Sequence, residues 1–313
     1  MKLGMGMNGR PVVSLLNNDV CNVIQIQCVW LLAAVRSRGP TLGHVIPSEG
    51  RGGVTAVTSL GNEVFVLREF SKQQVEVYDA VSCVLQRHIT VDVLSDYSIT
   101  YGLAACAQCK CLYVSDWDNH SIHRAELSGS SAVTTWSVAN LPAGLSVNRT
   151  RNVVVACSGA NKLQEYTSDG SLVREICLQA GVTSPCHAVQ LSSGDYVVSQ
   201  DTSPDVVSVV GVDGQVRHSY GQYRQSREFD VLQMKNPRGL AVTKNDDILV
   251  ADFGNNRIVS MNSSLSSVQE LALPVDGGIQ QPSGLCLDQS RCRLYVGEYG
   301  GSRRVLVFEN VKL

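Results

Sequence analysis

The chain has 313 residues, of which 44% are hydrophobic and 17% are charged, a composition typical of a folded globular protein. This length allows one all-β domain or two smaller domains. The formal net charge of −2 and the pI near 6.3 argue against a chain-wide electrostatic attraction to nucleic acid or anionic lipid, but they leave room for a local basic face.

The N-terminal segment, residues 1–45, shows no secretory signal, because its first apolar stretch begins only at Val20. That stretch runs to Val35, is 16 residues long and contains Asn22, Gln25 and Gln27. A membrane-spanning helix needs about 20 mostly apolar residues. We therefore expect no membrane segment.

The chain contains 11 cysteines, an odd number that cannot all pair internally. We interpret them as reduced thiols, several of them buried as small hydrophobic side chains. This favours a reducing compartment, so we expect a cytoplasmic protein, with an extracellular one as the alternative.

One sequence pattern recurs six times after the N-terminal segment. Each unit has a short apolar run, a polar turn, an apolar run that ends in a polar residue, a loop and a second apolar run. The units begin at residues 54, 102, 144, 186, 239 and 284. Repeats of about 40–50 residues made of short strands are typical of β-propellers. The sequence therefore predicts an all-β, six-bladed propeller of four-stranded antiparallel blades over residues 46–313.

The fifth unit illustrates the four strands of a blade, which we call a, b, c and d from the inside outward. The predicted strands are Gly239–Val242, Ile248–Ala251, Arg257–Met261 and Val268–Leu273. The turns between them are rich in Asn, Asp, Gly and Ser, which tolerate tight turn geometry.

The sixth unit supplies only three strands, the last at Val305–Phe308, and too few residues follow for a fourth. A strand from upstream of Val54 must therefore complete this blade and close the ring. Residues 23–30 and residues 41–46 are the two candidates, and the sequence does not decide between them.

Specific motifs resemble a known repeat family. Residues 237–242 (PRGLAV), 248–252 (ILVAD) and 254–258 (GNNRI) resemble a nearly complete NHL repeat. Residues 112–122 (LYVSDWDNHSI) are similar both to NHL repeats and to the YWTD propellers of lipoprotein-receptor type. The resemblance covers about residues 50–313.

This resemblance implies a non-catalytic platform that binds a macromolecular partner. In tripartite-motif ubiquitin ligases an NHL propeller selects the protein substrate, so a protein is the first expected partner. RNA is the second possibility. A third is an extracellular metal-dependent lyase or lactonase-like propeller, in which several histidines surround the channel. We expect a monomer without a cofactor.

Cys106, Cys109 and Cys111, followed by His120 and His123, superficially resemble a zinc module. The cysteines flank the a–b turn of the second unit, whereas His120 lies in its b–c loop. Because strand b separates the two ends by about 17 Å at roughly 3.3 Å per residue, one ion cannot be shared. We predict no metal site.

Asp116, Asp252 and Glu298 recur at the end of strand b. The third and fourth units have Cys157 and Gln200 there, so the carboxylates form no ring. We predict that each accepts backbone N–H bonds and shapes the b–c turn of its own blade. No nucleophile or phosphate-loop motif accompanies them, and we predict no catalytic residue.

The b–c loops and the d–a loops lie at the same end of a propeller, so six units build one surface. Exposed aromatic residues mixed with Asn, Asp and Arg favour partner binding there. The opposing interpretation is that Phe253 and Tyr299 only pack against neighbouring loops. The predicted surface contains Phe70, Tyr101, Trp117, Asp118, His120, Asn161, Asp201, Arg238, Phe253, Asn255, Asn256 and Tyr299. The predicted partner-binding residues are Tyr101, Trp117, His120, Arg238, Phe253, Asn255, Asn256 and Tyr299.

The linker between the fourth and fifth units interleaves basic and aromatic residues, as single-stranded RNA readers do. Glu228 and Asp230 interrupt this run. RNA recognition therefore stays the alternative to protein recognition. The basic residues are Arg217, His218, Arg224, Arg227, Lys235 and Arg238, and the aromatic ones are Tyr220, Tyr223 and Phe229.

Overall fold

The computed structural model describes residues 2–5, 11–14, 39–48, 52–69, 74–94, 99–127, 132–200, 202, 205–221 and 233–311. The chain divides into two compact units, residues 1–39 and residues 40–313. In the first unit, β1 (Lys2–Met5) pairs antiparallel with β2 (Pro11–Ser14). No helix in the described ranges is long and apolar enough to cross a membrane.

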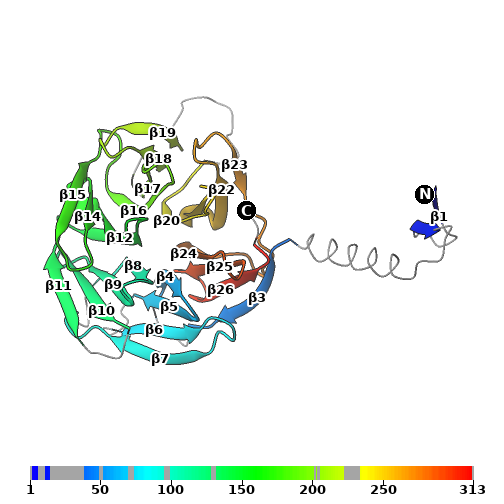
Figure 1. The fold of residues 1–313 in the computed structure, drawn as a ribbon, viewed down its shortest axis with the longest axis horizontal. Coiled ribbons are helices and arrows are strands. Elements are labelled where there is room, and N and C mark those ends of the chain that lie inside the picture. The colour runs from blue at the N-terminus through cyan, green and yellow to red at the C-terminus, as the bar shows by residue number, and fades with distance from the viewer. Residues whose placement is uncertain are drawn as a thin grey trace. The chain divides into compact units, whose positions relative to one another are not determined.

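The described part of the second unit is a ring of six four-stranded antiparallel sheets, which confirms the predicted six-bladed propeller (Figure 1). Blade I is β4 (Val54–Leu60), β5 (Glu63–Arg68), β6 (Gln74–Asp79) and β7 (Leu85–Thr90). Blade II is β8 (Leu103–Cys106), β9 (Cys111–Asp116), β10 (Ser121–Glu126) and β11 (Val133–Ser137). Blade III is β12 (Pro142–Val147), β13 (Val153–Cys157), β14 (Lys162–Tyr166) and β15 (Leu172–Cys177). Blade IV is β16 (Pro185–Gln190), β17 (Tyr196–Gln200), β18 (Val206–Val210) and β19 (Val216–Tyr220). Blade V is β20 (Pro237–Val242), β21 (Ile248–Asp252), β22 (Arg257–Met261) and β23 (Val268–Glu270). Blade VI is β24 (Pro282–Asp288), β25 (Arg293–Glu298), β26 (Val305–Glu309) and β3 (Thr41–Ile46).

The ring is closed by β3, the strand that precedes blade I in sequence. It pairs antiparallel with β26, and Ile46 lies opposite Val305. The candidate at residues 41–46 is therefore the closing strand, while the rival at residues 23–30 lies outside the described residues. The blade joins the two ends of the ring-forming segment, as the blue and red strands of Figure 1 show.

The core lies between adjacent blades. The second strand of each blade is covered on both faces, and every residue of β13 and of β21 is buried. Val197 and Val207 of blade IV, for example, pack in one cluster with Val250 and Val259 of blade V. Each blade therefore covers the apolar face of the next, which a single blade cannot do for itself.

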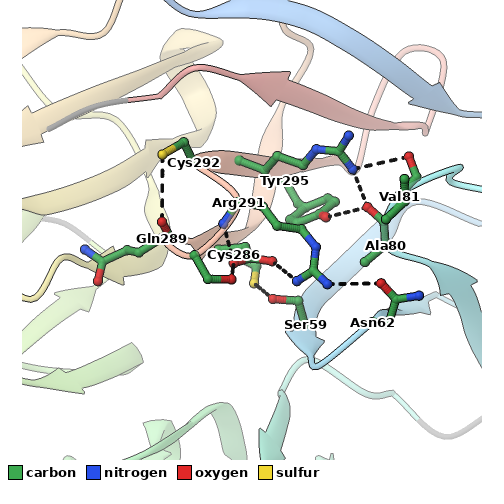
Figure 2. A network of polar contacts seen from close by, with 12 residues as sticks. Ser59, Asn62, Ala80, Val81, Cys286, Gln289, Arg291, Cys292 and Tyr295 are labelled. Atoms are coloured by element: carbon green, nitrogen blue, oxygen red, sulfur yellow. Dashed lines mark hydrogen bonds and ion pairs between the residues drawn. The ribbon is translucent and has the colours of Figure 1, made fainter. Parts of the chain in front are cut away.

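Polar contacts join blades VI and I on the face opposite the b–c loops (Figure 2). Ser59 Oγ lies 3.2 Å from Cys286 Sγ, and the Arg291 guanidinium donates to Asn62 Oδ1 at 3.0 Å. The Tyr295 hydroxyl donates to the Ala80 carbonyl at 3.4 Å. Burial raises the pKa of Cys286 to about 11, so this thiol is protonated at neutral pH and serves the seam as a hydrogen-bonding group.

Candidate functional site

One end of the ring is formed by the b–c loops together with the segments that lead into each first strand. The Trp117 N–H donates to Ile99 O at 3.0 Å, and the Tyr299 N–H donates to Gln281 O at 3.0 Å. In blade V the Gly254 N–H makes the equivalent bond, to Lys235 O at 2.8 Å. We call this end the b–c/d–a face. Its described residues are 52–53, 69, 99–102, 117–120, 138–141, 158–161, 182–184, 233–238, 253–256, 278–281 and 299–304.

The carboxylates at the ends of the second strands brace this face. Asp116 accepts the Asn119 N–H of its own b–c turn at 3.1 Å, as predicted. Asp252 instead accepts the Lys235 N–H at 2.7 Å, from the segment that leads into its blade. The predicted structural role of Asp252 is confirmed, but the prediction that it contacts only its own b–c turn was wrong. Asp252 binds both the turn and the segment that leads into its blade.

Glu298 makes the same kind of contact in blade VI. It accepts the Gln280 N–H at 2.8 Å and the Arg304 Nε–H at 2.9 Å. Burial raises the pKa of Glu298, and the Arg304 guanidinium and the Gln280 N–H oppose that rise. This carboxylate, like Asp252 with Arg257 at 2.7 Å, is paired inside the protein and is not aimed at a ligand.

Two predicted partner-binding residues, His120 and Asn256, use side-chain atoms to connect neighbouring blades. Both have a positive φ at the same position of their b–c turns, as Asn161 does in blade III. His120 Nδ1 accepts the Leu141 N–H at 3.2 Å, and Asn256 Oδ1 accepts the Gln281 N–H at 2.8 Å. These contacts give both side chains a structural task that the sequence pattern did not reveal.

The predicted residues Arg238, Phe253 and Tyr299 meet in one cluster. The Arg238 Cζ lies 3.7 Å from the centroid of the Phe253 ring and 5.5 Å from that of the Tyr299 ring. The two ring centroids are 6.0 Å apart. A guanidinium over an aromatic face is favourable by roughly 0.5–2 kcal/mol. Phe253 and Tyr299 therefore do pack against neighbouring groups, and in doing so they position a cation.

The Tyr299 hydroxyl adds a carboxylate to this cluster. It donates to Glu69 Oε1 at 2.6 Å, which ties the b–c loop of blade VI to the start of the b–c loop of blade I. Burial and the neighbouring Glu69 raise the pKa of Tyr299 to about 12. Sequence reasoning missed Glu69, although it directly follows strand b as Trp117, Phe253 and Tyr299 do.

Tyr101 and Trp117 form a second aromatic pair on the same face. Their ring centroids are 5.1 Å apart at an interplanar angle of 78°, an edge-to-face arrangement. Tyr101 is 37% exposed, so part of this pair is available to a partner. Asn255 is exposed as well, but its amide donates to Asp252 Oδ2 at 2.8 Å. Phe70 and Asp201 lie outside the described residues.

The two aromatic groups flank a cavity of about 600 Å³ along the axis of the ring. Its wall is built from the first strands of all six blades, with Ala, Val and Leu predominating. Tyr101, Trp117, Ser158 and Arg238, at or next to the ends of strands on the b–c/d–a face, belong to the lining residues.

Among the described residues, His187 is the one histidine that lines this cavity. Its Nδ1 accepts the Leu240 N–H at 3.0 Å, and its Nε2 lies 3.0 Å from the Leu145 carbonyl, to which it donates. The ring is thus neutral and bridges blades III, IV and V. With both nitrogens bound to backbone groups, it serves neither as a metal ligand nor as a base.

We expect the free energy of unfolding to depend on pH because His187 is held neutral in this bridge between blades. Burial lowers the pKa of His187, so on acidification the unfolded chain takes up a proton near pH 6.5 before the folded protein does. The free energy of unfolding should therefore fall as the pH drops from 7 to 5, by up to about 1.4 kcal/mol per pH unit from this residue. Urea unfolding at several pH values should show a shallower dependence in His187→Gln.

His218→Gln provides the matched control, because His218 is exposed on the outer strand β19. This variant should keep the wild-type pH dependence. Parallel loss of stability by His187→Gln and the wild type between pH 7 and pH 5 would contradict a His187 that stays neutral in the folded protein as the pH falls.

The three cysteines of blade II lie at the other end of the sheet from this face. Cys106 is opposite Cys111 in the β8–β9 hairpin, whereas Asp116 is opposite Ser121 at the far end of β9. His123 bonds to Asp116, with Nε2 3.3 Å from Oδ2. Over the described ranges, no group of three or more His, Cys, Asp or Glu residues has the geometry of a metal site.

Comparisons with known proteins bear on the fold. Residues 234–259 match the family profile of the NHL repeat. No curated protein sequence matches the chain. Among solved structures, a streptogramin B lyase is similar with 13% identity and a TM-score of 0.60, covering 86% of this chain and 97% of that one.

Two further structures show the same likeness. The hydrazine synthase of Kuenenia stuttgartiensis has 16% identity and a TM-score of 0.61, with 85% of this chain and 98% of that chain covered. The virginiamycin B lyase of Staphylococcus aureus has 10% identity and a TM-score of 0.60, with 86% and 99% covered. At these identities the likeness establishes the propeller fold and carries no activity over.

Proposed function

We propose that this chain, a six-bladed β-propeller with an NHL repeat at residues 234–259, is a non-catalytic platform that binds a protein partner on the b–c/d–a face. The aromatic residues around the cavity mouth carry this proposal. Trp117 and Tyr101 line the cavity there with Arg238, which stacks on Phe253, and clustered aromatic and arginine side chains are the commonest binding hot spots. The proposed biological setting is substrate selection, as in the propellers of tripartite-motif ubiquitin ligases.

The charges of the face favour protein over RNA as the partner. Two basic side chains at this end of the ring are neutralised within the protein: Arg304 pairs with Glu298 at 2.9 Å, and Lys162, at the start of β14, pairs with Glu175 at 2.7 Å. Arg217, one of the basic residues of the RNA hypothesis, is the second residue of β19, at the opposite end of the ring, and pairs with Asp213 at 2.9 Å. RNA affinity draws on several cations that contact phosphates.

The likeness to lyases suggests catalysis as the competing function, and the wall of the cavity argues against it. A metal-dependent lyase, the third possibility raised by the sequence, would need several histidine ligands around the channel. His187 is the histidine among the described lining residues, and the Leu145 and Leu240 backbones occupy its nitrogens. We therefore propose binding rather than catalysis. A metal assay on the purified protein, followed by an activity screen with streptogramin B, tests this choice independently.

Alanine at Trp117 or Phe253 should weaken partner binding by about 2 kcal/mol or more, roughly thirtyfold, as loss of a central anchor does. Folding should change little, because both residues are half-buried loop residues outside the strand core. The measurement is the recovery of crosslinked protein and of crosslinked RNA by each tagged variant in cells, together with its melting temperature.

Lys244→Ala is the control, since Lys244 is exposed in an a–b turn on the opposite face. It should leave recovery unchanged. Unfolding of the Trp117 and Phe253 variants would identify them as packing residues. Loss of recovery in the Lys244 variant alone would place the working surface on the other side, and recovery of RNA without protein would favour the RNA alternative.

A further inference from the structure

The b–c/d–a face does not involve the three cysteines of blade II, which lie at the other end of the sheet. Cys106 ends β8, Cys111 begins β9, and the two residues are opposite each other in the hairpin. The loop between them, residues 107–110, contains Cys109. All three are free thiols. Their arrangement therefore decides which two of them can react with each other.

A second loop of this kind occurs in blade VI, and it shows which side chains meet. Residues 289–292 join two opposite residues, Asp288 and Arg293, and the last loop residue, Cys292, has a φ of 52°. The Arg291 N–H donates to Asp288 Oδ1 at 3.1 Å, and the Arg291 guanidinium pairs with the same carboxylate at 2.8 Å (Figure 2). The side chain just before the loop and the side chain of its third residue therefore touch across the turn.

The loop of blade II has the same form. It has the same length, and its last residue, Lys110, also has a positive φ, of 46°. Cys106 and Cys109 thus occupy the positions of the two side chains that touch in blade VI. Four-residue hairpin loops are most often built around a type I turn, whose first and fourth Cα atoms are less than about 7 Å apart, within the span of a disulfide.

The pKa of Cys106 reports the same proximity. Burial raises this pKa, the Cys109 N–H lowers it, and the Cys109 thiol raises it. One ionisable group shifts the pKa of another in this way only at short range. The two sulfur atoms are therefore neighbours across the turn.

The three thiols differ in their access to solvent. Cys109 is partly exposed, and both of its neighbours, Gln108 and Lys110, are exposed. Cys106 is 2% exposed and Cys111 is 0% exposed. A dissolved oxidant therefore meets Cys109 first, and Cys106 is the thiol placed to react with it next. A direct bond between Cys106 and Cys111 would require the oxidant to reach a buried thiol.

We propose that Cys106 and Cys109 form a thiol–disulfide exchange site, which a low-molecular-weight disulfide such as oxidised glutathione converts to an internal disulfide. The Cys109 thiolate attacks one sulfur of oxidised glutathione, the S–S bond breaks, and one glutathione leaves as a thiolate with the bonding electron pair. Cys106 then loses its proton to water, its thiolate attacks Cys109 Sγ, and the second glutathione leaves.

The exchange is balanced in electrons and protons. Two cysteine thiols are oxidised, and one molecule of oxidised glutathione is reduced to two thiols. The two protons of the cysteines pass through water to the two glutathione thiolates. In a reducing compartment the pair is a dithiol, and oxidation of the glutathione pool closes it. This site is at the opposite end of the ring from the b–c/d–a face, so it is independent of the proposed function.

Peptide mapping of the wild-type protein tests the pairing directly. The reduced, folded protein is incubated with oxidised glutathione, and the remaining thiols are blocked with N-ethylmaleimide before denaturation and digestion by trypsin. Trypsin cleaves after Lys110, so Cys106 and Cys109 remain in one peptide, residues 88–110, whereas Cys111 begins the next. The proposed bond leaves peptide 88–110 lighter by two hydrogen atoms and without maleimide. A bond to Cys111 would join the two peptides.

Variants separate the roles of the two thiols. Cys106→Ser should retain glutathione on Cys109, with roughly tenfold more mixed disulfide than the wild type, because the second thiol is missing. Cys109→Ser should form no internal disulfide. Cys177→Ser is the control, because Cys177 is exposed on the outer strand β15, and its loss should leave oxidation of the pair unchanged.

A wild-type peptide 88–110 that keeps two maleimides, or that carries glutathione without an internal bond, would overturn the inference. A product joined to Cys111 would overturn it too, as would a Cys106→Ser protein with no more glutathione on Cys109 than the wild type. The wild-type measurement decides the pairing even if Cys106→Ser fails to fold. None of these results bears on partner binding at the b–c/d–a face.

Discussion

Replacing Ile46 with alanine should lower the free energy of unfolding by about 2–5 kcal/mol, the usual cost of cutting back a buried isoleucine in a well-packed core. Ile46 is 0% exposed and packs with Val54, Val64 and Val305, so one side chain of β3 touches blades VI and I together. The truncation leaves a void where the ring closes and weakens the pairing of β3 with β26. Chemical denaturation followed by tryptophan fluorescence measures the loss.

Val45→Ala is the control on the same strand. The Val45 side chain is 41% exposed, and its truncation should change the free energy of unfolding by about 0.5 kcal/mol or less. Equal effects of the two substitutions would mean that β3 is not packed into blade VI, and that the ring is closed in another way.

Replacing Arg68 with methionine should lower the free energy of unfolding by about 3–5 kcal/mol, because it removes the cation that pairs with the buried carboxylate of Glu76. Arg68 is 1% exposed, and its Nε donates to Glu76 Oε2 at 2.9 Å. Its other nitrogens donate to Arg303 O at 2.6 Å and to Pro47 O at 3.1 Å, so the same side chain joins blade I to blade VI and to the segment after β3.

Adding Glu76→Gln to Arg68→Met should recover part of that loss, since no charge is then stranded in the interior. Arg87→Met is the matched control, because Arg87 pairs with Glu63 at the surface, where ion pairs contribute about 0–1 kcal/mol. If Arg68→Met costs no more than Arg87→Met in urea unfolding, Arg68 does not secure the junction of blades VI and I.

The sequence specified the propeller well because its strongest signals come from the buried strands. Strand b of each blade is covered on both faces, so it reads as a continuous apolar run, and Ile248–Asp252 was predicted to within one residue. Outer strands bury little. In β15 only Ile176 is buried, and the same weakness of pattern left two candidates for the closing strand.

The candidate site was predictable in its location and less so in its contacts. Repeat alignment places Trp117, Arg238 and Phe253 at one end of the ring, because equivalent loops of every blade emerge there. It does not show which side chains bridge blades. His120 accepts the Leu141 N–H because its turn faces the segment that leads into the next blade. The spacing of residues within one repeat does not show how neighbouring blades face each other.

The swap of charges in blade I shows the same limit. Blades V and VI place a carboxylate at the end of strand b and an arginine near the start of strand c, as in Asp252 with Arg257. Blade I reverses the pair, with Arg68 at the end of strand b and Glu76 on strand c. A search of the sequence for a carboxylate at the end of strand b therefore misses blade I, although blade I keeps an ion pair between strands b and c, Arg68 with Glu76.

The most direct test of a working b–c/d–a face is to map where the partner touches the ring. A photo-crosslinking amino acid is placed at Ser302, exposed in the b–c loop of blade VI, and in a second protein at Lys244 on the opposite face. After irradiation in cells, a covalent protein adduct should form from position 302 and be lost when Trp117→Ala is added, and position 244 should give none. An adduct from position 244 alone, or one from position 302 that persists in the Trp117 variant, would contradict the assignment of this face.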